Sequence, residues 1–570
     1  MTDPLAPRMR WWGWGVDGHD APLPRPAVAL LRDELGVGDA RAAPPRLDQI
    51  ALAAPALPAQ QRAQLATAVG GAEYIRDDHL TRVAHAAGRS YPDLVRLRTG
   101  EQLNAPDAVV YPADHDQVAA VLAACAQNRI AVVPFGGGTS VVGGVEPTRG
   151  PFAAAISLDL ARLDGLHAID LRSQLATFGA GTLGPQVERR LQAHGLTLGH
   201  YPQSFEFSTV GGWAATRSAG QASTGYGRID ELTVALRAAT PSGELTTLAV
   251  PATAAGPDLR ELLLGSEGVL GVITEVTLRV RPRPQQQRFD TYALPGFAAG
   301  TDALRELEQA GAAPDVARLS DEEETRVSLA LASHPAATRL LRAYMDARTR
   351  RHGRDRPGLK PASGGPDRTA RPARPAGCTT ILGFDGEPDE IARRRSRARK
   401  ILRRHGAVAL GPVPGAAWAK GRFHGAYVRD ELMSRGVLVD TLETATTWSA
   451  LTATHQRIRA ALHDALAQRG TPPVVMCHVS HLYPTGASLY FTFLARQEAG
   501  AELAQWQAAK QAAGAAIGAA GATITHHHAV GRDHAPWLQG EIGALGIAAL
   551  KAVKAHVDPA GIMNPGKLIP

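Results

Sequence analysis

A glycine-rich loop directly after an apolar strand is the feature that most constrains the fold of this chain. Residues 130–133 read Ile-Ala-Val-Val, and residues 136–140 read Gly-Gly-Gly-Thr-Ser. Glycine tolerates a positive φ and has no Cβ, so successive N–H groups can surround an anion such as a phosphate. The loop matches neither G-x-G-x-x-G nor the Walker Gly-Lys-Ser/Thr pattern, which disfavours ATP chemistry. A glycine turn without a ligand is the alternative.

The hydrophobic pattern on both sides of this loop predicts alternating strands and helices. Residues 109–112 and 130–133 read as strands, and residues 114–128 between them have apolar positions at helical spacing. Further strands are predicted at 154–158, 176–178 and 272–280, and a helix at 183–193. This alternation indicates a fold that mixes helices and sheets.

Changes in composition divide the chain into parts. The run Arg-Pro-Arg-Pro at 281–284 indicates a boundary after the strand at 272–280. Beyond it, long helices predicted at 389–405 and 452–469 alternate with strands, which fits a sheet covered by helices on one face. We therefore expect an α+β protein with an N-terminal arm at 1–104, a ligand-binding domain at 105–283, a cap domain at 284–505 and a C-terminal segment at 506–570.

Charge and composition exclude several classes of protein. The chain has 570 residues, of which 44% are hydrophobic and 20% charged, so wholesale disorder is ruled out. The net charge is 61 − 54 = +7, and the Pro/Gly-rich insertion at 349–377 alone carries eight Lys/Arg against two Asp. We interpret this insertion as a solvated loop, with binding of nucleic acid or anionic lipid as the alternative. The rest of the chain, outside this insertion, is close to neutral in charge, so we expect no nucleic-acid partner.

The chain shows no signal for secretion or for spanning a membrane. No run of 18 apolar residues occurs, and the first residues lack a basic-then-apolar signal pattern. The three cysteines, Cys125, Cys378 and Cys477, lie far apart and indicate no disulfide framework. We therefore expect a cytoplasmic protein.

Two further loops of small residues strengthen the case for a phosphate ligand. Residues 204–212 combine hydroxyl side chains with paired glycines, and residues 216–220 follow at once. Residues 264–274 form a third Gly/Ser loop that runs into a strand. Three such loops within 140 residues of one another suggest a long ligand that contains a diphosphate.

These loops resemble the FAD domain of the vanillyl-alcohol oxidase/p-cresol methylhydroxylase superfamily, and more narrowly the chain resembles the alkyldihydroxyacetonephosphate synthase family. The resemblance covers most of the chain and fails mainly at the basic insertion. The segments that carry it are Met9 to Gly15 (MRWWGWG), Pro134 to Ser140, Ser204 to Arg217, Glu443 to Ala445 with Trp448, Gly486 to Phe491, and His526 to Gly531.

The resemblance implies a two-part FAD-binding domain, an α+β cap over the flavin, and FAD held without a covalent bond. It places the cofactor on four segments. They are Pro134, Phe135, Gly136, Gly137, Gly138, Thr139 and Ser140; Gln203, Ser204, Phe205, Glu206, Phe207, Ser208 and Thr209; Thr216, Arg217, Ser218 and Ala219; and Gly265, Ser266, Glu267, Gly268, Val269, Leu270 and Gly271.

Tyr490 is the candidate general acid or base. It lies in the sequence Leu-Tyr-Phe-Thr-Phe at 489–493, where strand alternation puts Tyr490 and Thr492 on one face. The alternative is a core strand with a tyrosine at its edge. A phenol with a pKa near 10 needs a cationic or imidazole neighbour to act as a base at neutral pH. The family resemblance assigns the catalytic tyrosine to this position.

His526, His527 and His528 follow residues 522–525, which are predicted as a strand. Adjacent side chains on a strand point in opposite directions, so three consecutive histidines rarely close on one metal ion. We therefore expect no metal here and interpret the imidazoles as groups that move protons and orient a substrate oxygen. A buried structural cluster is the alternative.

Two further residues are singled out by the resemblance. Arg318 matches an arginine that is important for activity in the family, and an ion pair with Glu322 or Glu323 is its alternative role. His478 stands where the synthases have an arginine for the substrate phosphate. An imidazole is neither permanently charged nor bidentate, so phosphate recognition is weakened here or moved to Lys420, Arg422 or Arg429.

Three functions remain open at this point. The resemblance implies exchange of the acyl chain of an acyl-dihydroxyacetone phosphate for a fatty alcohol, a redox-neutral step in ether lipid synthesis. An FAD-linked oxidoreductase acting on a hydroxy acid or alcohol is the second hypothesis, favoured by His478. A flavin-free scaffold that binds a membrane or nucleic acid through the basic loop is the third. With the first hypothesis we also expect a small or lipid-like substrate, a homodimer and a peripheral contact with a membrane.

Overall fold

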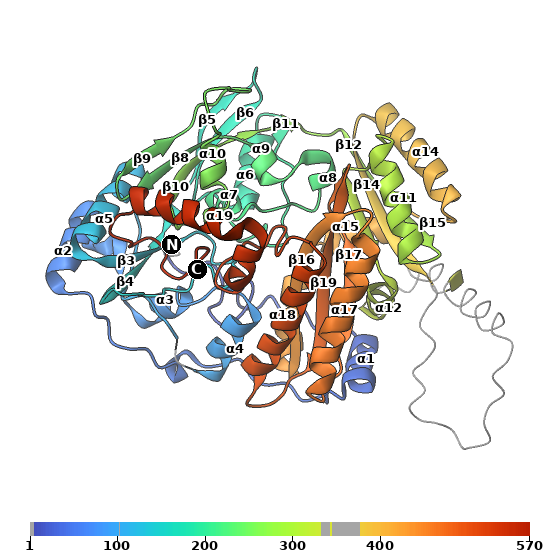
Figure 1. Ribbon diagram of the computed structural model, residues 1–570, viewed down its shortest axis with the longest axis horizontal. Coiled ribbons are helices and arrows are strands. Elements are labelled where there is room, and N and C mark those ends of the chain that lie inside the picture. Colours follow the sequence, from blue (N-terminus) through green and yellow to red (C-terminus); the bar gives the residue numbers. More distant parts are fainter. Residues whose placement is uncertain (1–4, 102, 332–342, 345–376) are drawn as a thin grey trace.

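The computed structural model describes residues 5–101, 103–331, 343–344 and 377–570. Figure 1 shows two bodies side by side, one built on the strands up to β10 and one on the large sheet from β12 to β19. The basic insertion predicted at 349–377 lies outside the described residues except for Gly377.

The N-terminal arm packs against both bodies. Its elements are α1 (Arg25–Leu35), α2 (Ala59–Ala68), α3 (His79–Ala84), α4 (Tyr91–Thr99), the short strand β1 (Ile75–Arg76) and 3₁₀ turns at Leu47–Gln49 and Ala72–Tyr74. Leu31 and Leu94 are buried in the core of the cap sheet, whereas Leu65 is buried in the core of the first body. The arm therefore ties the two bodies together.

The first body contains two sheets that share one core. The first sheet has the order β1-β2-β4-β3, in which β2 (Ala108–Val110), β4 (Ala154–Asp159) and β3 (Ile130–Phe135) are parallel and α5 (His115–Asn128) connects β2 to β3. Asp114 caps the N-terminus of α5, accepting a hydrogen bond from the N–H of Gln117, and the apolar face of the helix is buried. Ile156 of this sheet and Phe178 of the second lie in the same core.

The second sheet is antiparallel. Its order is β5 (Leu166–Asp170), β6 (Leu175–Gly179), β10 (Val272–Arg279), β8 (Thr233–Thr240) and β9 (Gly243–Thr246). A short antiparallel pair, β7 (Leu196–Thr197) with β11 (Arg281–Pro282), leads to the cap. The helices of this part are a 3₁₀ turn at Leu160–Arg162, α6 (Gly184–Gln192), α7 (Val210–Thr216), α8 (Ser223–Tyr226), α9 (Ile229–Leu232) and α10 (Arg260–Leu263).

The cap is one mainly antiparallel sheet with helices packed on it. The strand order is β15 (Val408–Gly411), β12 (Gln286–Leu294), β14 (Cys378–Gly386), β13 (Val316–Ser320), β17 (Val474–Val479), β19 (Gly486–Arg496) and β16 (Val437–Thr447), and β18 (Leu482–Tyr483) pairs with β19. Its helices are α11 (Phe297–Gln309), α12 (Glu322–Leu331), α14 (Pro388–Arg404), α15 (Val413–Gly421), α16 (Gly425–Ser434) and α17 (Leu451–Gln468).

Strand alternation in β19 separates a core face from a polar face. Phe491 and Phe493 are buried in one core with Ile458 and Leu462 of α17. Tyr490, which directly precedes Phe491, therefore points to the opposite face, which carries the site described below.

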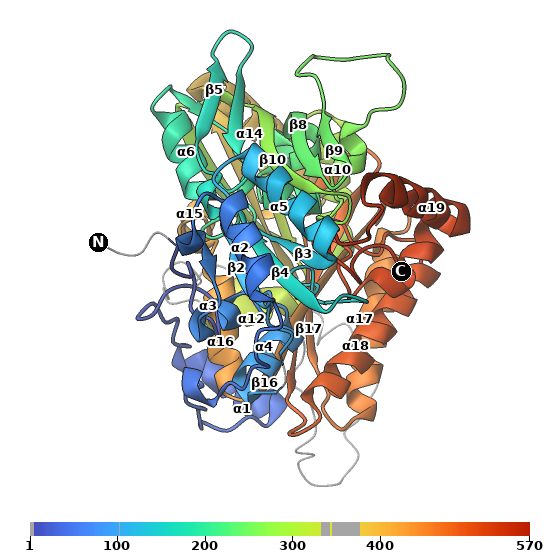
Figure 2. The same cartoon turned by 90° about the vertical axis from the view of Figure 1, so that its left-hand side faces the viewer.

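The C-terminal segment returns to the first body. It contains α18 (Glu502–Ala519) and α19 (Ala535–Val557), and Figure 2 shows α18 beside α17 and α19 near the second sheet. The tail then lies along β3, because the N–H of Val132 donates to the carbonyl of Ile562 (2.9 Å) and the N–H of Asn564 to the carbonyl of Val132 (2.8 Å). None of the described helices has the length and apolar content required to span a bilayer.

Candidate active site

The four glycine- and hydroxyl-rich segments of the sequence meet at one place in the first body. A Cβ on Gly137 would collide with the carbonyl oxygen of Phe207, so the first and second loops are in direct contact. A Cβ on Gly268 would lie 2.7 Å from Cγ of Pro134, so the third loop also touches the first. The N–H of Gly265, at the start of this third loop, donates to the carbonyl of Ala214 (2.9 Å), two residues before the segment at 216–219. Close backbone approach thus explains the glycines.

The first loop fits a diphosphate. The N–H groups of residues 137–140 hydrogen-bond to no other described residue, and Gly138 has a φ of 64°. Such a run of open amides is the arrangement that binds phosphate oxygens. Gly136 and Gly137 line a cavity together with His85 and Arg89. These loops therefore fit the phosphate-bearing part of FAD.

Changing Gly137 to alanine is expected to weaken FAD binding by about 10- to 100-fold, since relieving the collision with Phe207 displaces the amides of the first loop at a cost of about 1–3 kcal/mol. FAD titration of the apoprotein, followed by flavin fluorescence, measures this. The matched control is Gly518→Ala in α18, where an added Cβ meets no atom within 4 Å. Parent-like affinity in Gly137→Ala would contradict the assignment of this loop.

Glu267 fastens the C-terminal segment to the third loop. Its buried carboxylate accepts hydrogen bonds from the N–H groups of Val530 (2.8 Å) and Gly531 (2.7 Å). Burial raises the pKa of Glu267 to about 7, although these two N–H groups oppose the shift. Asn564 adds a second tie, donating from Nδ2 to the carbonyls of Gly144 and Glu267. The tail thus closes one side of the four loops.

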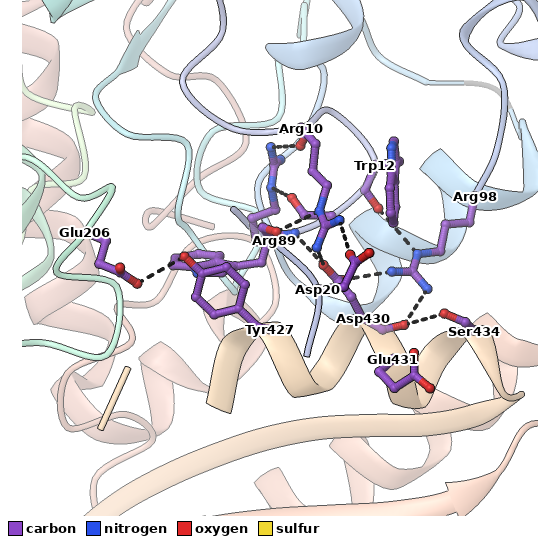
Figure 3. A network of polar contacts seen from close by, with 12 residues as sticks. Arg10, Trp12, Asp20, Arg89, Arg98, Glu206, Tyr427, Asp430, Glu431 and Ser434 are labelled. Atoms are coloured by element: carbon purple, nitrogen blue, oxygen red, sulfur yellow. Dashed lines mark hydrogen bonds and ion pairs between the residues drawn. The ribbon is translucent and has the colours of Figure 1, made fainter. Parts of the chain in front are cut away.

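The tryptophan-rich start of the chain is held by one buried carboxylate of the cap. Asp430 of α16 accepts from the N–H of Trp14 (2.6 Å). It also pairs with Arg98 (2.8 Å) and Arg10 (3.4 Å), as Figure 3 shows. The N–H of Arg89 donates to the carbonyl of Ser140 in the first loop (2.6 Å), and its Nε donates to the carbonyl of Gly13 (2.9 Å).

A second contact joins α16 to the second loop. The Tyr427 hydroxyl donates to the Glu206 carboxylate over 3.2 Å, also drawn in Figure 3. Because α16 reaches the first loop through the hydrogen bond from Arg429 to Arg89 and the second through Glu206, the cap is positioned directly against both loops.

Tyr490 lies among imidazoles on the polar face of β19. Its ring stacks on His478 at 4.8 Å between centroids and lies 6.0 Å from the ring of His527 and 5.4 Å from that of His528. Burial raises the pKa of Tyr490 to about 12, and the nearby Glu443 adds to this shift. The imidazole surroundings expected from the sequence are present, but the pKa moves upward rather than downward, because burial disfavours the phenolate and the carboxylates of Glu443 and Asp440 add to this shift.

Glu443 organises the histidine loop. It is fully buried, and its carboxylate accepts from the N–H groups of His526 (2.5 Å), His527 (3.0 Å) and His528 (2.8 Å) and from the Thr525 hydroxyl (2.6 Å). Burial alone would raise the pKa of Glu443, but attraction to the adjacent imidazoles in their protonated form and the hydrogen bond from Thr525 hold it well below its usual value. The strand predicted at 522–525 is wrong: these residues form a loop in which the N–H of Thr523 donates to the carbonyl of Ala445 (3.2 Å) and that of Ile524 to the carboxylate of Glu541 (2.8 Å).

The imidazoles of this cluster are neutral at pH 7. Burial lowers the pKa of His526 and His481 well below the usual value, lowers that of His527, and lowers that of His528 to about 3. Neutral imidazoles can accept a proton, which suits them to a proton-transfer role.

Arg318 and His478 form a group with a buried carboxylate. Glu324 accepts from Nη2 of Arg318 (2.7 Å) and lies 3.0 Å from Nδ1 of His478, and Arg318 also contacts the His478 ring at 3.1 Å. Burial would raise the pKa of Glu324, but Arg318 and His478 lower it to about 2. The ion-pair partner of Arg318 is therefore Glu324 and neither Glu322 nor Glu323, because Glu324 points into the sheet from the first turn of α12.

The three alternative phosphate residues occupy different environments. Lys420 is exposed, and Arg429 donates to the carbonyl of Arg89 (2.5 Å). The guanidinium of Arg422 lies over the rings of Tyr201 (4.3 Å) and Phe423 (5.1 Å), and within the described chain its side chain donates no hydrogen bond. Arg422 is thus the best placed of the three to receive an anion.

Sequence reasoning missed the buried carboxylates that hold the site. Glu443 stood in a quoted segment without a role, Glu267 was grouped with the cofactor loops, and neither Glu324 nor His481 was singled out. The hydrogen-bond partners of these residues lie at least six positions away in the sequence. Those of Glu443 and Glu267 lie more than eighty positions away. A carboxylate between apolar positions of a strand, as in Leu442-Glu443, is the only local signal.

Comparison with known protein families agrees with this architecture. A family described as the FAD binding domain matches residues 106–249, and one described as FAD linked oxidases, C-terminal domain, matches residues 283–568. The structure of p-cresol methylhydroxylase has the same fold, with a TM-score of 0.61 at 14% identity over 89% of this chain and 96% of that one. Fold and site therefore define a flavoprotein of the FAD-linked oxidase class, with the α+β architecture predicted.

Relatives with higher sequence identity identify one family within this class. An alkyldihydroxyacetonephosphate synthase of Dictyostelium discoideum is 32% identical over 87% of this chain and 79% of its own length. A solved alkyldihydroxyacetonephosphate synthase structure superposes with a TM-score of 0.81 at 28% identity, covering 98% of this chain and 99% of that chain. The chain belongs to the alkyldihydroxyacetonephosphate synthase family and is a FAD-dependent enzyme of this synthase type, so the predicted family and cofactor are confirmed.

Proposed function

We propose that this enzyme exchanges the acyl chain of an acyl-dihydroxyacetone phosphate for a fatty alcohol without net oxidation or reduction. The observation that carries the proposal is Tyr490, a phenol surrounded by neutral imidazoles on the cap face. Removal of a proton next to a ketone, followed by departure of a carboxylate, needs such a proton-transfer group. The family relationship supports the substrate class.

Each side chain of the site has its own role in the proposed reaction. FAD, when bound, supplies an electrophilic ring nitrogen and an electron sink. Tyr490 is protonated at neutral pH, because burial raises its pKa to about 12, so it donates its proton to an oxygen of the substrate. His527 and His528, whose rings lie within 6.0 Å of Tyr490, are neutral and take the proton that is removed from the carbon next to the substrate carbonyl. Arg318, held by Glu324, orients the substrate near His478.

The experiment is a reaction of the FAD-loaded enzyme with acyl-dihydroxyacetone phosphate and a fatty alcohol in the absence of oxygen. We expect ether product and free fatty acid in equal amounts, with no consumption of an added electron acceptor. Stoichiometric reduction of the acceptor would overturn the proposal. Bleaching of the flavin absorbance by a hydroxy acid would favour the oxidoreductase instead.

A further inference from the structure

A cavity lies between the N-terminal arm and the first cofactor loop. Residues 5–9 of the arm form one wall, and Gly136 and Gly137 of the loop form another. Tyr111 and Asp159 complete the lining at the carboxyl ends of β2 and β4. Ligands of open α/β sheets bind at this edge of the parallel strands. The cavity measures about 30 Å³, which is enough for one water molecule or one phosphate oxygen.

Arg8 lines this cavity and has a guanidinium nitrogen without a partner. Its Nη1 is buried and makes no hydrogen bond within the described chain, and its Nη2 reaches the carbonyl of Ala161 at 3.4 Å. The carboxylate of Asp159 does not serve as the acceptor, because its oxygens bond to Nε2 of His85 (2.9 Å) and to the N–H of Ala161 (2.8 Å). A buried donor without an acceptor is rare and unfavourable, so Nη1 is suited to an acceptor oxygen of a ligand.

The first loop presents donors to the same space. Gly137 lines the cavity, and the N–H groups of residues 137–140 hydrogen-bond to no other described residue. A guanidinium on one wall and open amides on the other form a surface of donors, while the carboxylate in the lining is already bonded. Such a surface fits the oxygens of an anion.

The arm is anchored on both sides of Arg8. Leu5 is buried in a cluster with Val109, and Met9 is buried in a cluster with Trp14. Arg8 is therefore held between two buried side chains and is pre-positioned for a ligand. Pre-positioning reduces the conformational entropy that a long side chain loses on binding.

Arg89 is the second arginine in the lining, and its guanidinium is fully engaged. Its nitrogens donate to the carbonyls of Gly13 (2.9 Å), Gly88 (2.8 Å) and Arg10 (3.1 Å). Figure 3 shows Arg89 beside Arg10 in this network. Arg89 thus holds the arm in place, and Arg8 is the arginine of the cavity that is left to bind an anion.

We propose that Arg8 binds the diphosphate of FAD together with the amides of the first loop, which makes the N-terminal arm a fifth segment of the cofactor site. A guanidinium forms charge-assisted hydrogen bonds to phosphate oxygens, and these are stronger than hydrogen bonds from amides. None of the four segments that the family resemblance assigned to FAD belongs to the arm. The inference concerns cofactor binding and does not depend on the exchange reaction proposed above.

The test compares the parent apoprotein with Arg8→Met in two titrations. FAD binding is followed by flavin fluorescence, and binding of ADP, which carries the diphosphate without the flavin, is followed by calorimetry. We expect Arg8→Met to weaken both ligands by about 10- to 100-fold, because both lose the same charge-assisted hydrogen bonds. The matched control is Arg32→Met, which removes an exposed arginine of α1 and should leave both affinities at the parent value.

Parent-like affinity of Arg8→Met for FAD and ADP overturns the proposal. Loss of FAD affinity alone also overturns it, because the diphosphate is common to both ligands, and so does an equal loss in Arg32→Met. If Arg8→Met fails to fold, as judged by circular dichroism, hydrogen exchange of the parent protein decides the matter. Saturation with ADP should slow exchange of the amides at residues 5–9, and unchanged exchange there overturns the proposal.

Discussion

Replacing Tyr490 with phenylalanine is expected to lower kcat by about 100- to 10,000-fold, the range that a positioned proton-transfer group contributes. The ring would still pack between His478 and His527, so the fold is kept and only the hydroxyl is lost. FAD affinity and the flavin absorption spectrum should not change, because Tyr490 lies on a cap strand and outside the four cofactor loops. Steady-state kinetics of the loaded enzyme, beside a flavin titration, measures both.

A matched control separates loss of this hydroxyl from loss of any buried phenol. Tyr292 is buried on β12 of the same sheet, and Tyr292→Phe should retain kcat within about twofold, since the residue lies in the helix-covered core. Equal losses in the two variants would show that Tyr490 supports the sheet and transfers no proton. A loss confined to KM in Tyr490→Phe would indicate a binding role only.

Replacing Glu443 with glutamine is expected to destabilise the protein by about 3–5 kcal/mol and to lower kcat by more than about 100-fold. The carboxylate accepts four hydrogen bonds, and an amide nitrogen in its place would face N–H groups of the histidine loop. Release of this loop removes His526, His527 and His528 from their places around Tyr490. Thermal unfolding and activity assays of the loaded enzyme test the two effects.

Glu541 provides the control for this substitution. Its exposed carboxylate accepts from the Thr523 hydroxyl (2.7 Å) and the Ile524 N–H (2.8 Å), just before the same loop. Glu541→Gln should cost less than about 1 kcal/mol, because water can replace the lost interactions at an exposed site. Similar losses in both variants would mean that the burial of Glu443 has no special importance.

Much of the cofactor region could be predicted because its signals are local. The glycines at 136–138 indicate close backbone approach, and in the structure a Cβ at Gly137 would collide with the carbonyl oxygen of Phe207. The alternation around Tyr490 likewise follows from the period of a strand, and Phe491 and Phe493 face the core as expected. The role of each cofactor-loop residue stays a prediction until FAD binding is measured.

The catalytic surroundings could not be predicted in the same way. The upward shift in the pKa of Tyr490 depends on burial and on Glu443, 47 positions earlier. The strand predicted at 522–525 fails for a similar reason, since a propensity pattern cannot show that the carboxylate of Glu541 will take the N–H of Ile524.

The sequence by itself determined a diphosphate-containing ligand, the mixed helix-and-sheet architecture and the face on which Tyr490 lies, because these depend on glycine placement and on periodicities of a few residues. The resemblance to a known family added that the ligand is FAD. Only the tertiary structure decided which charges and rings surround that phenol. Glu443, Glu324 and His481 reach their partners through the pairing of strands and the return of the C-terminal segment. Such contacts are set by the packing of whole elements, and a side chain carries no local mark of the distant group that it will meet.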